Sequence, residues 1–524
     1  MKNLLFIILL LFFSIAIFPQ SGNSDQIIIY PDSGKYKISR NIYGQFAEHL
    51  GHLIYGGIWV GKNSPIPNKD GIRSDIVKAL REIKIPNLRW PGGCFADEYH
   101  WKDGIGPQSK RPKIVNTNWG GVIEDNSFGT NEYMDLIEQL GCDAYICGNI
   151  GSGTVKEMSD WVDYLTGDTL TAMGKLRKKN GRAEPWKVKF WAVGNETWGC
   201  GGIMSPEFYS EELARYSHFL KNNGKNYLYR VASGGLEADY DWTETLMKKW
   251  SETQGWLQGY MNGYSLHYYT VTHNWDHKGS ATDFNEEDWF TSMLKTRRMD
   301  TLIANHSKVM DKYDPEKKIG LIVDEWGDWH DVEPGTNPGF LYQQNTLRDA
   351  MVAAINLNIF NKHCDRVKMA NIAQLVNVLQ ALILTKNEKM ILTPTYYVFD
   401  LYKVHQDATL LPMELKSEDY LMNGQKTPAL SASASVSPDG TINLSIANVN
   451  PDKSIEVPCI FNNFKPGKIS GKILTSEKMQ DHNTFEQPDK VKINEFNQYK
   501  IDGEKIIINM PSKSIVVLEI KNRI

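Results

Sequence analysis

Residues 190–202 read FWAVGNETWGCGG, and this stretch places a carboxylate directly after a buried strand. Its apolar run ends at Asn195 and Glu196, and glycines then turn the chain away. A second stretch, IGLIVDEWG at residues 319–327, has the same form and carries Glu325. Each stretch by itself is also explained as a strand that ends in ordinary polar residues with no catalytic role. The fold decides whether the two acids meet.

Eight apolar segments with strand character alternate with amphipathic segments between about residues 41 and 385. They are IYGQFAEHL, NLRWPGG, CDAYICGNI, KFWAVGNE, YRVASGG, YSLHYY, IGLIVDEWG and VKMANIAQ. Helix signals lie between them, such as Ser205 followed by Pro206, which is typical of an N-cap and a first helical position. This rhythm predicts a (β/α)8 barrel over residues 40–388. A doubly wound open sheet is the alternative, but the sequence has no G-x-G-x-x-G motif.

From about residue 391 the pattern becomes that of short antiparallel strands. LSASASVSPDGTINLSIANVN, residues 430–450, alternates polar and apolar residues on both sides of a Pro-Asp-Gly turn. This predicts an all-β sandwich over residues 389–524. Residues 22–39 have the same pattern and are predicted to join it. The predicted fold class is therefore α/β, a barrel with a sandwich built from both ends of the chain.

The first 21 residues predict a secretory signal peptide. Lys2 precedes an apolar run from Leu4 to Phe18 that only Ser14 interrupts, and the run is shorter than a membrane span. A short membrane anchor is the alternative. Export to the periplasm or outside the cell would place the six cysteines where disulfides form, with no membrane span in the processed protein.

Charge and motif content exclude several functions. Lys and Arg number 58 against 62 Asp and Glu, so there is no basic excess to bind nucleic acid. The histidine-rich stretch HYYTVTHNWDH, residues 267–277, is interpreted as an aromatic loop rather than a set of metal ligands. No G-x-S-x-G motif offers a serine nucleophile.

In a barrel the carboxyl ends of the strands meet on one rim, so Glu196 and Glu325 form a candidate catalytic pair. Two carboxylates that face a glycosidic bond can divide the work, because one protonates the departing oxygen while the other attacks the anomeric carbon. Asn195 can hydrogen-bond a sugar hydroxyl, and Trp198 could form an aromatic wall. Arg89 could keep Glu325 ionised, with a structural salt bridge as the alternative.

The sixth strand ends on His267, Tyr268 and Tyr269 near the second acid. His267 is either a structural histidine or a proton-transfer group. Strand alternation predicts that one tyrosine faces the site while the other packs outward.

Six ordered motifs resemble those of the family 51 glycoside hydrolases, the retaining α-L-arabinofuranosidases. They are IYGQFAEHLG, NLRWPGGCFADEYHWKDGIGP, VGNETWGCGG, SLHYY, VDEWG and ANIAQLVNVLQALILT. The resemblance implies that the protein removes terminal arabinofuranosyl groups from arabinoxylan, arabinan or their oligosaccharides. It also implies a barrel with a β-sandwich, no cofactor, and a homo-oligomer that is often a hexamer.

Carried over by position, Glu196 resembles the acid/base of this family and Glu325 its nucleophile. Glu48, Asn195 and Gln374 resemble residues that hold the sugar ring through its hydroxyls, and Arg89 one that supports the nucleophile. The sugar-contacting tyrosine could be Tyr268 or Tyr269.

Cys94 is a departure from the family pattern. Some members have Asn after the Pro-Gly-Gly motif and use its amide on the sugar, whereas a thiol is a poor donor. Either this contact is weakened, or Cys94 pairs with Cys200 as a disulfide.

Two alternative functions follow from the same residues. Another retaining barrel glycosidase, such as an endoglucanase or a β-xylosidase, would share the architecture and the carboxylate pair. A non-catalytic carbohydrate-binding protein would keep the fold alone, although the intact pair of acids argues against it.

Overall fold

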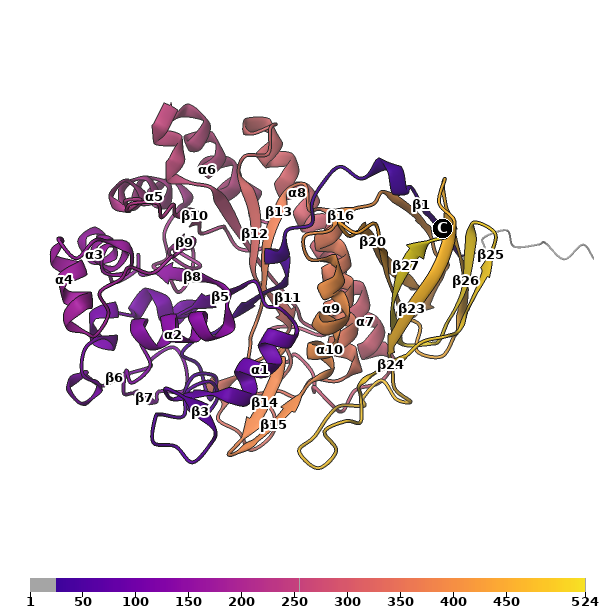
Figure 1. Ribbon diagram of the computed structural model, residues 1–524, viewed down its shortest axis with the longest axis horizontal. Helices are drawn as coiled ribbons and strands as arrows, with labels where there is room; N and C mark the ends of the chain where they lie inside the picture. The colour runs from indigo at the N-terminus through magenta and orange to yellow at the C-terminus, as the bar shows by residue number, and fades with distance from the viewer. Residues whose placement is uncertain (1–24, 254, 524) are drawn as a thin grey trace, which may run out of the picture.

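The computed structural model describes residues 25–253 and 255–523, and a closed parallel barrel is its central feature (Figure 1). Its strands are β2 (Gly44–Phe46), β5 (Asn87–Trp90), β8 (Asp143–Gly148), β9 (Phe190–Val193), β10 (Tyr229–Ala232), β11 (Gly263–Thr270), β12 (Gly320–Asp328) and β13 (Val367–Ile372). They follow one another around the barrel in chain order, and β13 pairs with β2 to close it. Each of the eight predicted segments overlaps one of these strands, so the barrel prediction is confirmed.

Helices and small hairpins connect the barrel strands or follow the last of them, β13. The helices are α1 (Ser74–Glu82), α2 (Thr130–Leu140), α3 (Val155–Thr166), α4 (Ala172–Lys179), α5 (Pro206–Phe219), α6 (Tyr240–Glu252), α7 (Glu286–Thr296), α8 (Arg298–Tyr313), α9 (Leu347–Lys362) and α10 (Pro394–Tyr402). The hairpins are β3–β4 (Asn68–Lys69, Ile72–Arg73), β6–β7 (Ile114–Val115, Ile123–Glu124) and β14–β15 (Ile383–Lys386, Lys389–Leu392). Of these elements, α10 and the β14–β15 hairpin follow β13. The Ser205 side chain accepts a hydrogen bond from the Phe208 N–H, so Ser205 is the predicted N-cap of α5.

The C-terminal region forms two antiparallel-rich sheets. One has the order β17-β1-β22-β26-β25 and the other β16-β20-β21-β27-β23-β24. The strands are β1 (Gln26–Ile29), β16 (Thr409–Leu410), β17 (Met413–Lys416), β20 (Leu430–Val436), β21 (Ile442–Asn448), β22 (Ile455–Phe461), β23 (Pro466–Leu474), β24 (Ile493–Glu495), β25 (Tyr499–Asp502), β26 (Lys505–Met510) and β27 (Ser514–Asn522). A hairpin, β18–β19 (Asp419–Met422, Gln425–Pro428), lies beside them. Because β1 pairs with β17 and β22, the N-terminal strand joins the sandwich as predicted.

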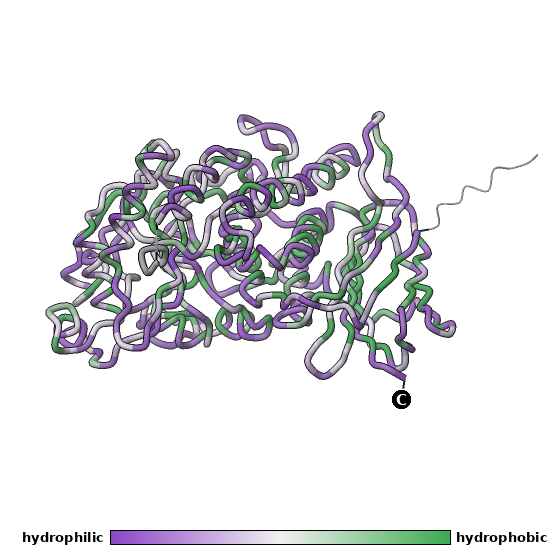
Figure 2. The backbone as a smooth tube through the Cα atoms, turned by 90° about the horizontal axis from the view of Figure 1, so that it is seen from above, coloured by the Kyte–Doolittle hydropathy of each residue, from purple (hydrophilic) through white to green (hydrophobic). Residues whose placement is uncertain are grey.

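Helix α9 lies between the barrel and the sandwich (Figure 1). It packs on β12 of the barrel and on β20 and β21 of the sandwich, and all of its residues except Lys362 are buried. A helix enclosed on all sides has no solvent face, and a buried polar residue such as Asn358 bonds instead to a neighbour, Ser431. Figure 2 shows hydrophobic stretches along the sandwich strands and hydrophilic loops outside them. The predicted domain boundary after residue 388 falls within the β14–β15 hairpin, and the domain limits stay a prediction.

The longest helices within residues 25–253 and 255–523, α8 and α9, have 16 residues each. No helix in these ranges combines the length and apolarity that crossing a bilayer requires.

One buried histidine near the sandwich makes stability depend on pH. His405 is fully buried, with its ring nitrogens 2.8 Å from Ser435 Oγ and 3.2 Å from Ser445 Oγ. Burial lowers the pKa of His405 to about 3. Below pH ~6.5 the unfolded chain therefore takes up a proton that the folded protein refuses, so stability falls as the pH falls towards 3. For this one group we expect a loss of about 2 kcal/mol between pH 7 and pH 5.

The variant His405→Gln isolates this contribution, because the amide can still bond both serines but does not titrate. From pH 7 to pH 5 we expect the free energy of unfolding of the wild type to fall by about 2 kcal/mol more than that of the variant. Thermal unfolding of both proteins in matched buffers measures it. A difference between the two proteins that is constant over this range would show that His405 is not held neutral.

Candidate active site

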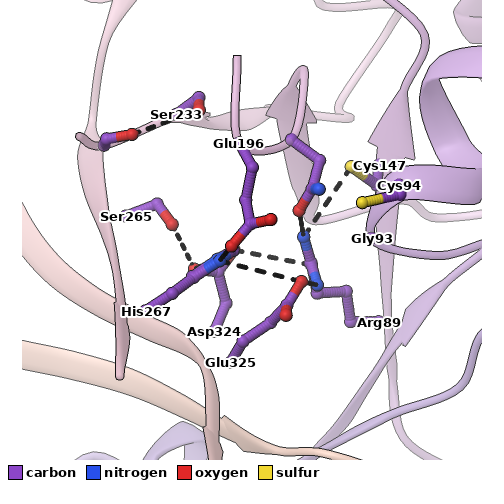
Figure 3. A network of polar contacts seen from close by, with 12 residues as sticks. Arg89, Gly93, Cys94, Cys147, Glu196, Ser233, Ser265, His267, Asp324 and Glu325 are labelled. Carbon is purple, nitrogen blue, oxygen red and sulfur yellow. Dashed lines mark hydrogen bonds and ion pairs between the residues drawn. The ribbon is translucent and has the colours of Figure 1, made fainter. Parts of the chain in front are cut away.

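A pocket of about 360 Å³ opens at the carboxyl ends of the barrel strands. It is lined by Glu48, Leu50, Gly93, Cys94, Trp119, Glu196, Trp198, Leu236, Glu237, His267, Tyr268, Tyr269, Trp275, Glu325, Trp329, Leu341, Gln374 and Leu379. Both predicted acids, Glu196 just after β9 and Glu325 on β12, point into this region, with His267 and Arg89 close by (Figure 3). The two acids therefore lie together at the rim of the barrel, and their catalytic roles stay a prediction.

Glu325 is held by two fixed partners. Its Oε1 accepts a hydrogen bond from Arg89 Nη1 at 2.7 Å, and its Oε2 accepts one from the Tyr269 hydroxyl at 2.8 Å. Arg89 is completely buried, and its guanidinium also lies over the ring of Phe46. A fixed cation beside a carboxylate favours the ionised form. Glu325 is thus held in one orientation between a buried guanidinium and a hydroxyl.

Glu196 lies in a different environment, just beyond the end of β9. Its backbone has φ +40°, in the left-handed region that non-glycine residues avoid, and its side chain is 22% exposed against 9% for Glu325. Oε1 of Glu196 lies 2.9 Å from Nδ1 of His267. One oxygen of each acid and a ring nitrogen of His267 lie within 4.8 Å of one another. The two carboxylates therefore face one small volume from different surroundings.

His267 links the two acids to a third one. Its Nε2 lies 3.2 Å from Oδ1 of Asp324, and its Nδ1 lies 3.8 Å from Oε1 of Glu325. Burial acts to lower the pKa of His267, but the charge of Glu325 and the contacts to Asp324 and Glu196 outweigh it and raise the pKa to about 10. A proton at this imidazole is therefore strongly held.

Glu48 is an enclosed acid that also lines the pocket. Its Oε1 accepts hydrogen bonds from the Gly93 N–H, the Phe95 N–H and Trp119 Nε1, and its Oε2 accepts one from Gln374 Nε2 at 2.9 Å. Burial and the charge of Glu325 raise the pKa of Glu48 to about 7. This acid is spatially fixed, as a group that recognises sugar hydroxyls must be.

Asn195 is fixed from two sides. Its side-chain oxygen accepts a hydrogen bond from Arg89 Nη2 at 2.6 Å, and its N–H donates to Asp97 Oδ2 at 3.1 Å. Asp97 also accepts from the N–H groups of Ile150 and Gly151, so it joins the loops after β8 and β9. The NH2 end of the same amide lies beside the disulfide, where it donates to Cys200 Sγ at 3.8 Å.

The remaining predicted residues divide between the pocket wall and the structure behind it. A disulfide joins Cys94 to Cys200, with Cα atoms 5.5 Å apart, so the second of the two possibilities for Cys94 is the one observed. Trp198 lines the pocket. Both tyrosines line the pocket, but the Tyr268 hydroxyl donates to the Lys295 carbonyl, whereas the Tyr269 hydroxyl donates to Glu325.

Several residues at the site were not predicted. Asp324 was visible in the motif VDEWG as a second acid within an apolar strand, and Asp97 as an acid in CFADEY. Trp119, Trp275 and Trp329 lie in loops or just past a strand, where the sequence has no periodic signal. Only the closed fold brings them to the pocket.

Among the described residues, three clusters of donor atoms could bind a metal ion by distance alone, and one of them is Glu196 with Cys94 and Cys200, whose sulfurs are joined as a disulfide. The other two consist of acids with a histidine. In the first of these two, Glu196, His267 and Glu325 already engage one another, Arg89 and Tyr269. The second, Asp328, His330 and Asp349, is fully buried beside the Arg348 guanidinium, 2.9 Å from the His330 ring. A cation of the protein itself therefore accompanies the acids in each of these two clusters.

A parallel barrel with paired acids on its fourth and seventh strands, one beside a fixed cation and the other partly exposed, defines the class of barrel glycoside hydrolases. Two family models match the chain. They are the alpha-L-arabinofuranosidase 1 domain over residues 79–278 and the alpha-L-arabinofuranosidase C-terminal domain over residues 324–514.

Individual proteins agree with these matches. The chain is 52% identical to an intracellular exo-alpha-L-arabinofuranosidase of Bacteroides ovatus, over 95% of this chain and 96% of that protein. The structure superposes on a GH51 arabinofuranosidase of Xanthomonas axonopodis pv. citri with a TM-score of 0.92 and 46% identity, covering 95% of this chain and all of that one. It also matches an arabinose complex of the Thermotoga maritima alpha-L-arabinofuranosidase, with a TM-score of 0.83, 29% identity and the same coverage. The chain belongs to the family 51 glycoside hydrolases, the α-L-arabinofuranosidases.

The prediction of export is wrong by the same comparison. The Bacteroides ovatus relative is named an intracellular enzyme, which contradicts a periplasmic or extracellular location. The predicted signal peptide, residues 1–21, lies outside the described residues. An apolar N-terminal run was the only basis of that prediction.

Proposed function

We propose that the protein is an exo-acting, retaining α-L-arabinofuranosidase that works by double displacement. The observation that carries the proposal is the acid pair: oxygens of Glu196 and Glu325 lie within 4.8 Å of one another. Retaining glycosidases hold their two carboxyl groups about 5–5.5 Å apart, whereas inverting enzymes leave a wider gap for water.

The surroundings of each acid assign its role. Arg89 and Tyr269 orient Glu325, which attacks the anomeric carbon and forms an arabinosyl ester. Glu196 gives its proton to the departing oxygen as the glycosidic bond breaks. In the second half, Glu196 takes a proton from water, and the resulting hydroxyl replaces Glu325 at the anomeric carbon.

The fixed polar groups of the pocket are suited to hold the sugar. Glu48, Gln374 and Asn195 are all buried. Gln374 donates to Glu48 and Arg89 donates to Asn195, so these side chains can bind hydroxyls without first having to be ordered. The disulfide between Cys94 and Cys200 and the ring of Trp198 supply apolar wall. The substrate class that we propose is arabinose-containing glycans, such as arabinoxylan, arabinan and their oligosaccharides.

A panel of 4-nitrophenyl glycosides tests the substrate. We expect the α-L-arabinofuranoside to have a kcat/KM at least about 100-fold above the β-D-xyloside and the β-D-glucoside, because buried polar groups matched to one sugar penalise another. Release from the β-xyloside or β-glucoside without release from the arabinofuranoside would replace this function by that of another barrel glycosidase. Binding without any release would indicate a carbohydrate-binding protein.

Assembly into a homo-oligomer stays a prediction from the family resemblance. Light scattering on the purified protein, at several concentrations, measures the number of subunits directly.

A further inference from the structure

Asp324 is a buried acid that the proposed mechanism does not use. It directly precedes Glu325 on β12 and is only 1% exposed. Neighbouring residues of a regular strand point to opposite faces, but the pairing of β12 with β13 shifts register between Val323 and Trp326. Both acids thereby reach the interior of the barrel rim (Figure 3).

Four side chains from three strands fix the Asp324 carboxylate. Its Oδ2 accepts a hydrogen bond from the Tyr145 hydroxyl at 2.6 Å and lies 3.5 Å from Arg89 Nε. Its Oδ1 accepts a short hydrogen bond from Ser265 Oγ and lies 3.2 Å from Nε2 of His267. A carboxylate surrounded by this many donors accepts hydrogen bonds and stays ionised.

These contacts determine which way the His267 ring presents its nitrogens. Nε2 faces Asp324, so Nδ1 faces Glu196 Oε1 at 2.9 Å. We propose that Asp324 is a positioning residue. It accepts a hydrogen bond from the Nε2–H of His267 and so turns Nδ1 towards Glu196, as the partner that shares the acid/base proton with Glu196. The proposal rests on the acid/base role of Glu196 in the proposed function.

The charges around this relay keep Asp324 ionised. Burial acts to raise its pKa, but Arg89 and His267 hold the pKa well below the usual range of a carboxyl. The other titratable groups in the same volume are Glu196, Glu325, Tyr145 and Cys147. Asp324 is therefore a constant negative charge on the far side of the imidazole from Glu196. Removal of the Asp324 charge makes the proton shared by Glu196 and His267 easier to lose.

The variant Asp324→Asn tests this role through the pH profile. We expect the alkaline limb of kcat/KM for an aryl arabinofuranoside to move down by about one pH unit, because one adjacent negative charge is lost. The matched control is Tyr145→Phe, which removes one hydrogen bond to Asp324 but leaves its charge, and which should leave the limb in place. A uniform loss of activity in Asp324→Asn, with the limb unmoved, would reduce Asp324 to a structural residue and overturn the proposal.

A measurement on the wild-type enzyme decides the same point without relying on the folding of that variant. In protein labelled with 15N-histidine, His267→Gln identifies the His267 signals. We expect Nε2 to carry a proton at every pH at which the enzyme is active. A neutral ring protonated on Nδ1 alone would overturn the proposal.

The orientation of His267 and the acid/base role of Glu196 are tested by different measurements. The NMR result depends only on Asp324 and His267, whereas the role of Glu196 is tested by leaving-group dependence in Glu196→Ala. If Nε2 is protonated but that variant shows no such dependence, the assignment of Glu196 falls and the orientation of His267 stands.

Discussion

Glu325→Gln is expected to lower kcat on 4-nitrophenyl α-L-arabinofuranoside by about 10⁴-fold or more, because no other group can form the arabinosyl ester. The amide keeps the shape of the side chain and its oxygen can still accept from Arg89, whereas its NH2 end can no longer accept from the Tyr269 hydroxyl. The charge and the nucleophilicity are lost. Initial rates at saturating substrate measure the effect.

Glutamine is preferred to alanine at this position for a physical reason. Arg89 is completely buried, and alanine would remove one of its charged partners and leave space beside a buried cation. The matched control is Glu316→Gln, an exposed glutamate paired only with Lys318 on the surface, which should retain full activity. Activity of Glu325→Gln within about tenfold of wild type would remove Glu325 from the nucleophile role, since loss of a nucleophile costs far more.

Glu196→Ala is expected to have an effect that depends on the leaving group. For substrates with poor leaving groups, kcat/KM should fall by about 10²–10⁴-fold, because the departing oxygen is no longer protonated. For 4-nitrophenol or better leaving groups the first step needs little help, so kcat/KM should change much less. Hydrolysis of the ester then becomes slow, since no base activates water.

Azide separates the two acids by the product that it forms. In Glu196→Ala, azide can enter where the general base stood and attack the ester on Glu325, so the rate should rise and the product should be the α-L-arabinofuranosyl azide. Azide that replaced a missing nucleophile would instead give the β anomer. The acid/base role of Glu196 would be contradicted if azide did not raise the rate and kcat/KM fell equally for substrates with good and with poor leaving groups.

The barrel was predictable because its strands are short, apolar and bounded by polar residues at their carboxyl ends. WAVGNE and LIVDEWG showed where β9 and β12 end, and closure of the barrel then brings their acids together. The β-sandwich was predictable from alternation around the turn at Pro438-Asp439-Gly440, and β1 joined it as its pattern indicated.

The parts that were missed depend on three-dimensional details. Period-two alternation left Tyr268 and Tyr269 undecided, because β11 shifts register between Ser265 and His267, and only the structure shows that Tyr269 reaches Glu325. The role of Asp324 follows from its neighbours on β5, β8 and β11, none of which is near it in sequence. Loop tryptophans such as Trp119 have no pattern that places them at the pocket.

Trapping of the covalent intermediate tests the central claim most directly. In Glu196→Ala, a substrate with a good leaving group should load the enzyme faster than the ester is hydrolysed, so the intact mass should increase by one pentosyl group. Peptide mapping after acid quenching should place this group on Glu325. An ester on Glu48 or any other residue, or no mass increase while leaving group is released in a stoichiometric burst, would contradict the account.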